Sequence, residues 1–166
     1  MAIEPGDVSD FIDAQESVWE LACVELANER KKSHWIWWIF PQHAGLGRSS
    51  TSVDWGLSST ATAEAYLQNA VLGDRLRYCC DLLLHLPLGM DIVDIMGGSV
   101  DAMKVRSCMT IFDMVAPDDV FRDVLSRYFA GNPDNATMSL VDPARSVRRS
   151  RIAEEKLRRA AESGGR

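Results

Sequence analysis

Polar side chains that can bind an anion surround a cluster of tryptophans in the first third of the chain. The cluster is Trp35, Trp37 and Trp38. The polar residues on its two sides are Lys32, His34, Gln42, His43 and Arg48. Cations and amides beside indole rings suit a phosphorylated or carboxylated compound. Because three indoles in water would expose a large apolar patch, the segment must be either a binding site or a buried structural element.

A glycine-containing loop follows the tryptophans and offers a second anion contact. Gly45 and Gly47 precede Arg48, and Ser49 begins a predicted short helix. Free backbone N–H groups at a helix start, with flexible glycines and a guanidinium group, can hold phosphate or carboxylate. The pattern matches neither the P-loop nor the dinucleotide fingerprint. The alternative is that Ser49 only caps the helix and Arg48 is solvated.

A third group of candidate contacts lies in residues 104–110. On a helix, Lys104 and Ser107 share one face with Cys108. Such a face either supplies anion contacts or is a solvated stripe with extended cationic side chains. We expect a ligand site only if this group meets the segment at 32–48 in space.

Two residues are candidates for general-base catalysis in a hydrolytic reaction. They are His34 and Asp13. A histidine often only donates to a backbone carbonyl, and an acid early in a helix is often a surface group, so whether the protein is an enzyme stays open. The histidines and cysteines show no spacing typical of a metal site, and neither a metal nor another cofactor is predicted.

The elements that must position these residues are predicted to be helices. Apolar residues recur at helical spacing, and alternating apolar–polar runs are scarce. The tryptophan segment is apolar on every side, which indicates a central buried helix. Caps and breakers give predicted helices over residues 10–31, 34–40, 49–56, 63–69, 73–86, 91–96, 99–115, 120–131 and 134–140. The expected fold class is all-α, a single multihelical domain with buried central helices.

The charge distribution separates the chain into an acidic body and a basic tail. The 166 residues, 46% hydrophobic and 25% charged, suit one globular domain, which we place at 7–141. Residues 1–141 carry ten Lys/Arg against twenty Asp/Glu, whereas residues 142–166 carry eight against four. The acidic body argues against nucleic-acid binding except through residues 145–159 of the tail. We expect that tail to be a loose helix or disordered.

The remaining features concern location and assembly. The N-terminal sequence lacks the pattern of a signal peptide, and the longest apolar run, Trp35–Pro41, is too short to span a membrane. Four cysteines without a CxxC pair are typical of a reducing compartment. We therefore expect a cytoplasmic protein without a membrane span, and a monomer.

Several motifs in one order resemble a known family. They are Asp13-Ala14-Gln15, Lys32–Trp35 through Ile39–Gln42, Gly45–Ser49, Tyr66-Leu67, Val71–Gly73, Lys104–Ser107 and Thr110–Phe112. This set resembles the domain-of-unknown-function 1810 family, whose members are sometimes labelled calpastatin-like, over about residues 9–141. The resemblance implies a single multihelical domain with buried central helices. It implies no reaction, nothing in the chain looks like calpastatin's inhibitory repeats, and the basic tail lies beyond the shared region.

Two functional hypotheses follow from these observations. The first is a site for a small anionic or nucleotide-like compound, such as a phosphorylated or ADP-ribose-like ligand. Its expected contacts are Lys32, His34, Gln42, Gly45, Gly47, Arg48, Lys104 and Ser107, with Trp35, Trp37 or Trp38 as a stacking wall. The alternative is a non-enzymatic protein-interaction module, in which the tryptophans are core and an exposed helix face or the basic tail binds a partner.

Overall fold

The chain folds into helices joined by short loops. The computed structural model describes residues 1–163, apart from the side chains at 145, 146, 149 and 163. Its first five α-helices are α1 (Asp10–Glu16), α2 (Trp19–Ala27), α3 (Ile36–Ile39), α4 (Ser50–Asp54) and α5 (Thr60–Gln68). The next six are α6 (Ala70–His85), α7 (Ile92–Met96), α8 (Ser99–Val115), α9 (Val120–Phe129), α10 (Asn135–Val141) and α11 (Pro143–Ser163). Two 3₁₀-helices are η1 (Pro5–Asp7) and η2 (Ala44–Leu46). The predicted all-α fold is confirmed.

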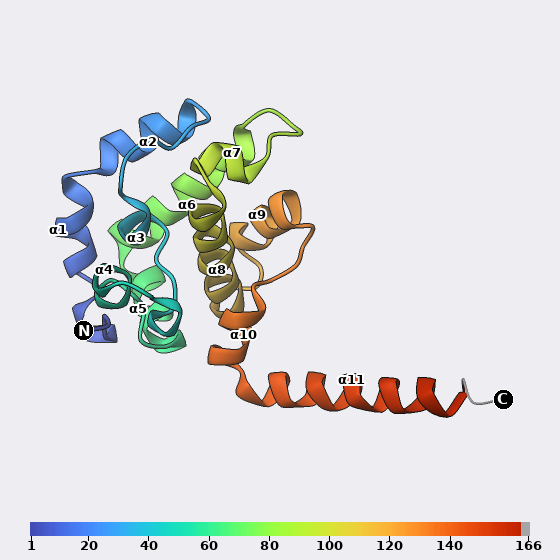
Figure 1. Cartoon of the computed structure of the whole chain (residues 1–166). Coiled ribbons are helices and arrows are strands. Elements are labelled where there is room, and N and C mark those ends of the chain that lie inside the picture. The colour runs from blue at the N-terminus through green and yellow to red at the C-terminus, as the bar shows by residue number, and fades with distance from the viewer. Residues whose placement is uncertain (164–166) are drawn as a thin grey trace.

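The two longest helices of the body lie at its centre. Helices α6 and α8 cross the middle of the molecule, and α5 and α9 pack against both of them (Figure 1). The Phe112 ring of α8 meets Tyr66 of α5 at 5.4 Å and Phe121 of α9 at 5.5 Å between ring centroids. The predicted buried central helices are therefore confirmed, and α8 is the one that also reaches the candidate site.

The single helix predicted over residues 10–31 is wrong, because the chain forms α1 and α2 with a bend between them (Figure 1). At the bend, Val18 leaves helical geometry (φ −128°, ψ −8°), and the Ser17 hydroxyl donates to the carbonyl of Ala14. Such a local bond competes with the helical ladder. Helix α2 then ends at Ala27, before Glu29 turns the chain with φ 64°.

The tryptophan segment forms one helical turn, α3, rather than a helix over 34–40. The segment is held in place from α2 by Glu25. One Glu25 oxygen accepts from the backbone N–H groups of Lys32 (2.8 Å) and Ser33 (3.0 Å) and from the Trp35 indole (2.8 Å). The other accepts from the Ser33 hydroxyl at 2.6 Å. A buried carboxylate thus fixes the entry to α3.

These hydrogen bonds determine the protonation of Glu25. Burial raises the pKa of its carboxyl, but the bonds from Ser33, Lys32 and Trp35 outweigh burial and lower the pKa to about 2. The ionised group is therefore favoured by the folded state. Its stabilisation is present above the ordinary glutamate pKa and is lost as the pH falls through the folded value.

Other boundaries differ from the predictions by a few residues. Helix α6 begins at Ala70 instead of residue 73, because the Asn69 side chain accepts from the N–H groups of Val71 and Leu72. The same residue ends α5. The two helices therefore meet at a single capping residue, which the apolar pattern alone does not reveal.

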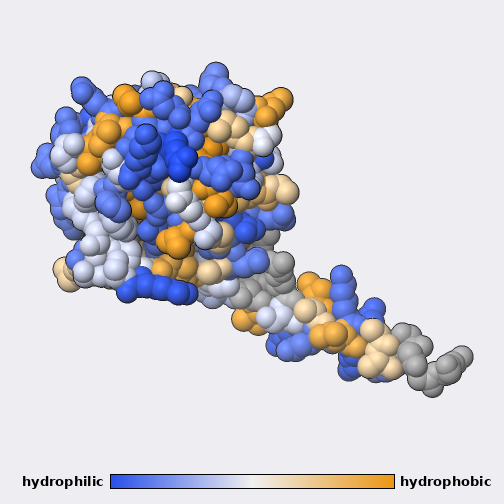
Figure 2. Space-filling model, turned by 45° about the horizontal axis from the view of Figure 1, so that its top comes forward, coloured by the Kyte–Doolittle hydropathy of each residue, from blue (hydrophilic) through white to orange (hydrophobic). Residues whose placement is uncertain are grey.

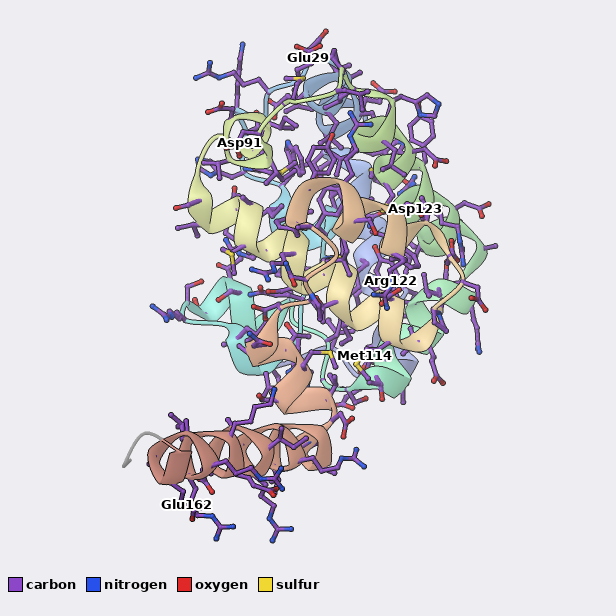
Figure 3. All side chains as sticks on the ribbon, turned by 90° about the vertical axis from the view of Figure 1, so that its right-hand side faces the viewer. Glu29, Asp91, Met114, Arg122, Asp123 and Glu162 are labelled. Carbon is purple, nitrogen blue, oxygen red and sulfur yellow. The ribbon has the colours of Figure 1, made fainter. Side chains whose placement is uncertain are left out.

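Helix α11 projects from the body beyond α10 (Figure 1). Figure 2 shows it as a mostly hydrophilic rod with scattered apolar groups, and Figure 3 shows Glu162 near its far end. Its described apolar residues Val147, Ile152 and Leu157 are exposed. Among the described helices, none combines the length and apolar character that crossing a membrane requires.

We predict that Glu25→Gln lowers the free energy of unfolding at pH 7 by about 2–3 kcal/mol, because the amide accepts fewer of these bonds and carries no charge. Urea denaturation at pH 7 and pH 3 measures the change, and the gap between wild type and variant should narrow at the lower pH. The matched control is Glu64→Gln, an exposed acid of α5. Equal stabilities of the two variants at pH 7 would contradict the assigned role of Glu25.

Candidate functional site

The α8 surface borders a cavity of about 660 Å³, here called the larger cavity. Its wall combines apolar, cationic and hydroxyl-bearing side chains. They are Trp37, Gln42, Leu46, Arg48, Ser49, Ser52, Ser99, Val100, Met103, Lys104 and Ser107. A volume of this size accommodates a small organic molecule.

A second cavity of about 440 Å³, here called the smaller cavity, adjoins the first. It is lined by Lys31, His34, Ile36, Trp37, Gly97, Gly98, Ser99, Val100, Asp101 and Lys104. Four of these residues, Trp37, Ser99, Val100 and Lys104, line both cavities. The two spaces are therefore neighbours on either side of the Trp37 and Lys104 side chains.

One stripe of α8 supplies a wall common to the site. Ser99, Met103 and Ser107 follow one another at intervals of four residues, as do Val100 and Lys104. Residues four apart lie on one face of a helix. The stripe faces the cavities while Val105, Cys108, Met109 and Phe112, on the other side of α8, are fully buried in the core.

An ion-pair network joins α8 to the tryptophan segment. The Asp101 carboxylate lies 2.7 Å from the Lys31 ammonium and 3.1 Å from the Lys104 ammonium. Lys31 also lies over the Trp35 ring at 5.0 Å, and Lys104 lies over the Trp37 ring at 5.1 Å. Burial raises the pKa of Asp101, but the two lysines outweigh it and hold the pKa below its ordinary value. One carboxylate is thus shared by two cations.

Several polar groups of the larger cavity have no partner among the described residues. The Arg48 guanidinium and the Gln42 amide make no side-chain hydrogen bond or ion pair there. The Ser107 hydroxyl is also unpartnered, although the residue is only 5% exposed. The Trp37 indole N–H is buried without an acceptor in the same part of the chain. Arg48 is exposed and Gln42 is half-buried, so water reaches these groups and a polar ligand in the cavity would replace that water.

The structure brings four of the predicted contacts into the larger cavity, namely Gln42, Arg48, Lys104 and Ser107. His34 is exposed and lines the smaller cavity instead. Lys32 lines neither cavity, because its side chain is exposed and only its backbone N–H is engaged, by Glu25. The segment at 32–48 and the stripe of α8 therefore do meet in space.

Two of the three tryptophans lie outside the cavity walls. Trp35 is fully buried, and its indole is bound by Glu25, so no face of it is open to a ligand. Trp38 is partly buried between Trp37 and Trp55, with centroid distances of 5.9 and 6.1 Å. Its carbonyl accepts from Gln15 at 2.7 Å. Only Trp37 is placed to meet a ligand.

The two glycines of the predicted anion loop are packing residues in this structure and line neither cavity. A Cβ atom at Gly47 would lie 2.8 Å from Val53, and one at Gly45 would lie 3.0 Å from the Leu140 methyl group. The Gly45 N–H donates to the His43 ring at 3.0 Å. Their small size thus lets α4 and α10 approach the loop that carries Arg48.

The two candidate general bases are not brought together. Asp13 is exposed on α1 and lines neither cavity. His34 lies in the smaller cavity without a carboxylate bound to its ring among the described residues. The described part of the chain also contains no cluster of three side chains suited to a metal ion.

Sequence reasoning missed Lys31, Ser99, Asp101 and the Gly97-Gly98 pair as neighbours of the site. The repeat of Ser99, Met103 and Ser107 at four-residue spacing is a signal that could have shown one common face. The partnership of Lys31 with Asp101 had no such signal, because it joins residues that are seventy positions apart.

The fold and the site together define a multihelical domain with a polar cavity beside a tryptophan-rich turn. The family model described as "Protein of unknown function (DUF1810)" matches residues 5–141. The chain therefore belongs to the DUF1810 family, and the predicted resemblance is confirmed. Helix α11 lies outside the matched region.

A solved structure has the same fold. It is the crystal structure of the conserved hypothetical protein Rv1873 from Mycobacterium tuberculosis, with a TM-score of 0.77 and 38% sequence identity. The similarity covers 81% of this chain and 96% of that one. No functionally curated protein matches the chain.

We predict that Asp101→Asn lowers the free energy of unfolding by about 2 kcal/mol at pH 7, because buried Lys31 loses its counter-charge. Chemical denaturation across pH 3–7 measures it. Since the Asp101 pKa is lowered by folding, its stabilisation is present at neutral pH and declines in acid, so the difference from wild type should shrink there. Asp118→Asn, at an exposed position, is the control. A constant difference across that pH range would contradict this role.

Proposed function

We propose that this protein binds a small anionic, nucleotide-like compound in the larger cavity. The observation that carries the proposal is the convergence of Arg48, Lys104 and the unpartnered Ser107 around Trp37. Arg48 supplies a planar cation that pairs with a phosphate or carboxylate. Trp37 supplies a flat apolar surface for a ring.

The local charge supports an anion rather than a cation. Arg48 and Lys104 line the larger cavity, and no carboxylate among the described residues does so, although Asp101 pairs with Lys104 from outside it. The body as a whole is acidic, with ten Lys/Arg against twenty Asp/Glu in residues 1–141. An acidic body repels large polyanions in general. Two cations at one cavity attract a small anion at that place, which favours a defined ligand.

The neutral groups support an organic ligand. The Gln42 amide can both donate and accept, and the Ser107 hydroxyl is available for a sugar or ring substituent. Val100, Met103 and Leu46 provide apolar contact. Phosphorylated and ADP-ribose-like compounds combine these features. Asp13 and His34, the two candidate general bases, are too widely separated to act together on a ligand in the larger cavity.

A thermal-shift screen against AMP, ADP-ribose and ribose 5-phosphate tests the proposal. A ligand at one hundred times its Kd adds about 2.7 kcal/mol to the stability, enough to raise Tm by about 5 °C. Arg48→Ala should weaken binding of the stabilising probe about tenfold or more, as measured by calorimetry. Arg151→Ala, which removes the same charge from α11, should leave it unchanged. If no probe raises Tm, or if both variants bind equally well, the proposal fails.

The projection of α11 favours a second candidate, binding of single-stranded nucleic acid by the tail. Residues 142–166 carry eight Lys/Arg against four Asp/Glu, and the described side chains of α11 are exposed. Phosphate contacts need such accessible cations. This function would be independent of the cavities, because α11 lines neither of them.

We predict that the triple variant Arg148→Gln, Arg151→Gln and Lys156→Gln reduces binding of a fluorescent 20-nucleotide oligouridine. If all three side chains contact phosphates, the plot of log binding constant against log salt concentration should become less steep. The magnitude of its negative slope should decrease by about 2, as measured by fluorescence anisotropy. Arg48→Ala is the control and should not change it. Unaltered binding of the oligouridine by the triple variant would show that α11 does not bind single-stranded nucleic acid through these residues.

A further inference from the structure

The N-terminus of α8 opens into the smaller cavity. This helix spans 17 residues and has no side-chain cap. Among the described residues, no acceptor meets the backbone N–H groups of Ser99 and Val100, which line the cavity. The first N–H groups of a helix carry its partial positive charge and favour an anion. Gly98 has φ 155°, and a Cβ atom there would meet nothing within 4 Å, so the backbone is accessible.

The side chains that line the smaller cavity carry a net positive charge. Lys31 and Lys104 share the single carboxylate of Asp101. His34 is exposed in the same cavity and can donate a hydrogen bond. An anionic group placed here therefore meets free N–H groups, one uncompensated cation and an imidazole. A phosphoryl group fits this donor set.

An independent observation at the other end of the stripe bears on the length of a ligand that would contact both ends. Ser107 lines the larger cavity with an unpartnered hydroxyl, although it is 95% buried (5% exposed). It lies eight residues along α8 from Ser99, a distance of about 12 Å at the helical rise. Inorganic phosphate is too small to reach both ends. A molecule that satisfies both must carry an organic part beside its phosphate.

The surface between these ends suits a ring rather than a flexible chain. Trp37 and Lys104 line both cavities, and Val100 and Met103 lie along the stripe between the helix end and Ser107. Gln42 and Arg48 stand at the larger cavity with free planar polar groups. Such planar groups hydrogen-bond to or stack on a heterocyclic base.

We infer that the ligand is a nucleoside 5′-phosphate that lies along α8, with its phosphate at the helix N-terminus in the smaller cavity. Its sugar and base occupy the larger cavity between Trp37, Gln42 and Ser107. This inference rests on the proposed function and adds an orientation to it. It assigns Ser99, Gly98 and His34 to recognition of the phosphate.

The variant Ser99→Asp tests this orientation. An acid in the first turn of a helix favours the helix dipole, so the fold is not weakened. The new carboxylate repels a phosphate at the same place. Calorimetry with AMP and with adenosine separates the phosphate from the rest of the ligand. Ser99→Asn keeps the size without the charge, and Ala70→Asp adds the same charge at the exposed start of α6.

Wild type should bind AMP about tenfold or more tightly than adenosine, and Ser99→Asp should remove most of that difference. Adenosine binding by Ser99→Asp should stay within about twofold of wild type, and the control variant Ala70→Asp should bind AMP as wild type does. Ser99→Asn should keep a preference for AMP over adenosine, because it adds no charge. If AMP binding depends on Arg48 but not on the charge at position 99, the orientation is overturned and the proposed function stands. If neither AMP nor adenosine binds wild type, this inference is overturned; failure of all three probes in the screen overturns the proposed function as well.

Discussion

The carboxylate of Glu25 is the interaction on which the site depends. It lies inside the body and accepts from two consecutive backbone N–H groups, a hydroxyl and an indole. No other described side chain ties α2 to the segment before α3 in this way. A buried charge is tolerated only when hydrogen bonds replace its hydration, and here four donors do so. Both cavities adjoin the turn that this carboxylate holds.

The anchored turn gives neighbouring tryptophans different environments. Because Trp35 is hydrogen-bonded to Glu25 and covered by Lys31, its ring is buried in the core and cannot contact a ligand. Trp37 lies two residues later on a helical turn, so it points to another side and reaches α8. The ammonium groups over these two rings share Asp101. The segment from Trp35 to Trp37 and the Asp101 carboxylate thus connect the core to the polar wall of the cavities.

The sequence was informative where patterns are local. Helices over residues 73–86, 99–115, 120–131 and 134–140 are predicted by caps and helical periodicity, and α6, α8, α9 and α10 lie there. The break between α1 and α2 is not predicted by the sequence, because apolar residues at helical spacing, such as Ala14 and Val18, continue across it. Phe11 and Leu26 are both buried, so periodicity alone could not separate the two helices.

The candidate site was predictable in composition but not in arrangement. Arg48, Lys104 and Ser107 were chosen by chemical type, and the structure places them in one cavity. Gly45 and Gly47 were expected beside a ligand, yet they accommodate Leu140 and Val53. A glycine that permits close packing and one that exposes backbone look alike in a sequence. Only the neighbours distinguish them, and these lie far away along the chain.

The close approach of Leu140 to Gly45 places α10, which precedes α11, against the loop beside the site. The loop with Gly45 carries Arg48 three residues later, and α11 begins three residues after Leu140. Helix α11 follows α10 directly and spans 21 residues, about 30 Å. The part of the chain beyond the family domain is thus joined to the domain beside its candidate binding site.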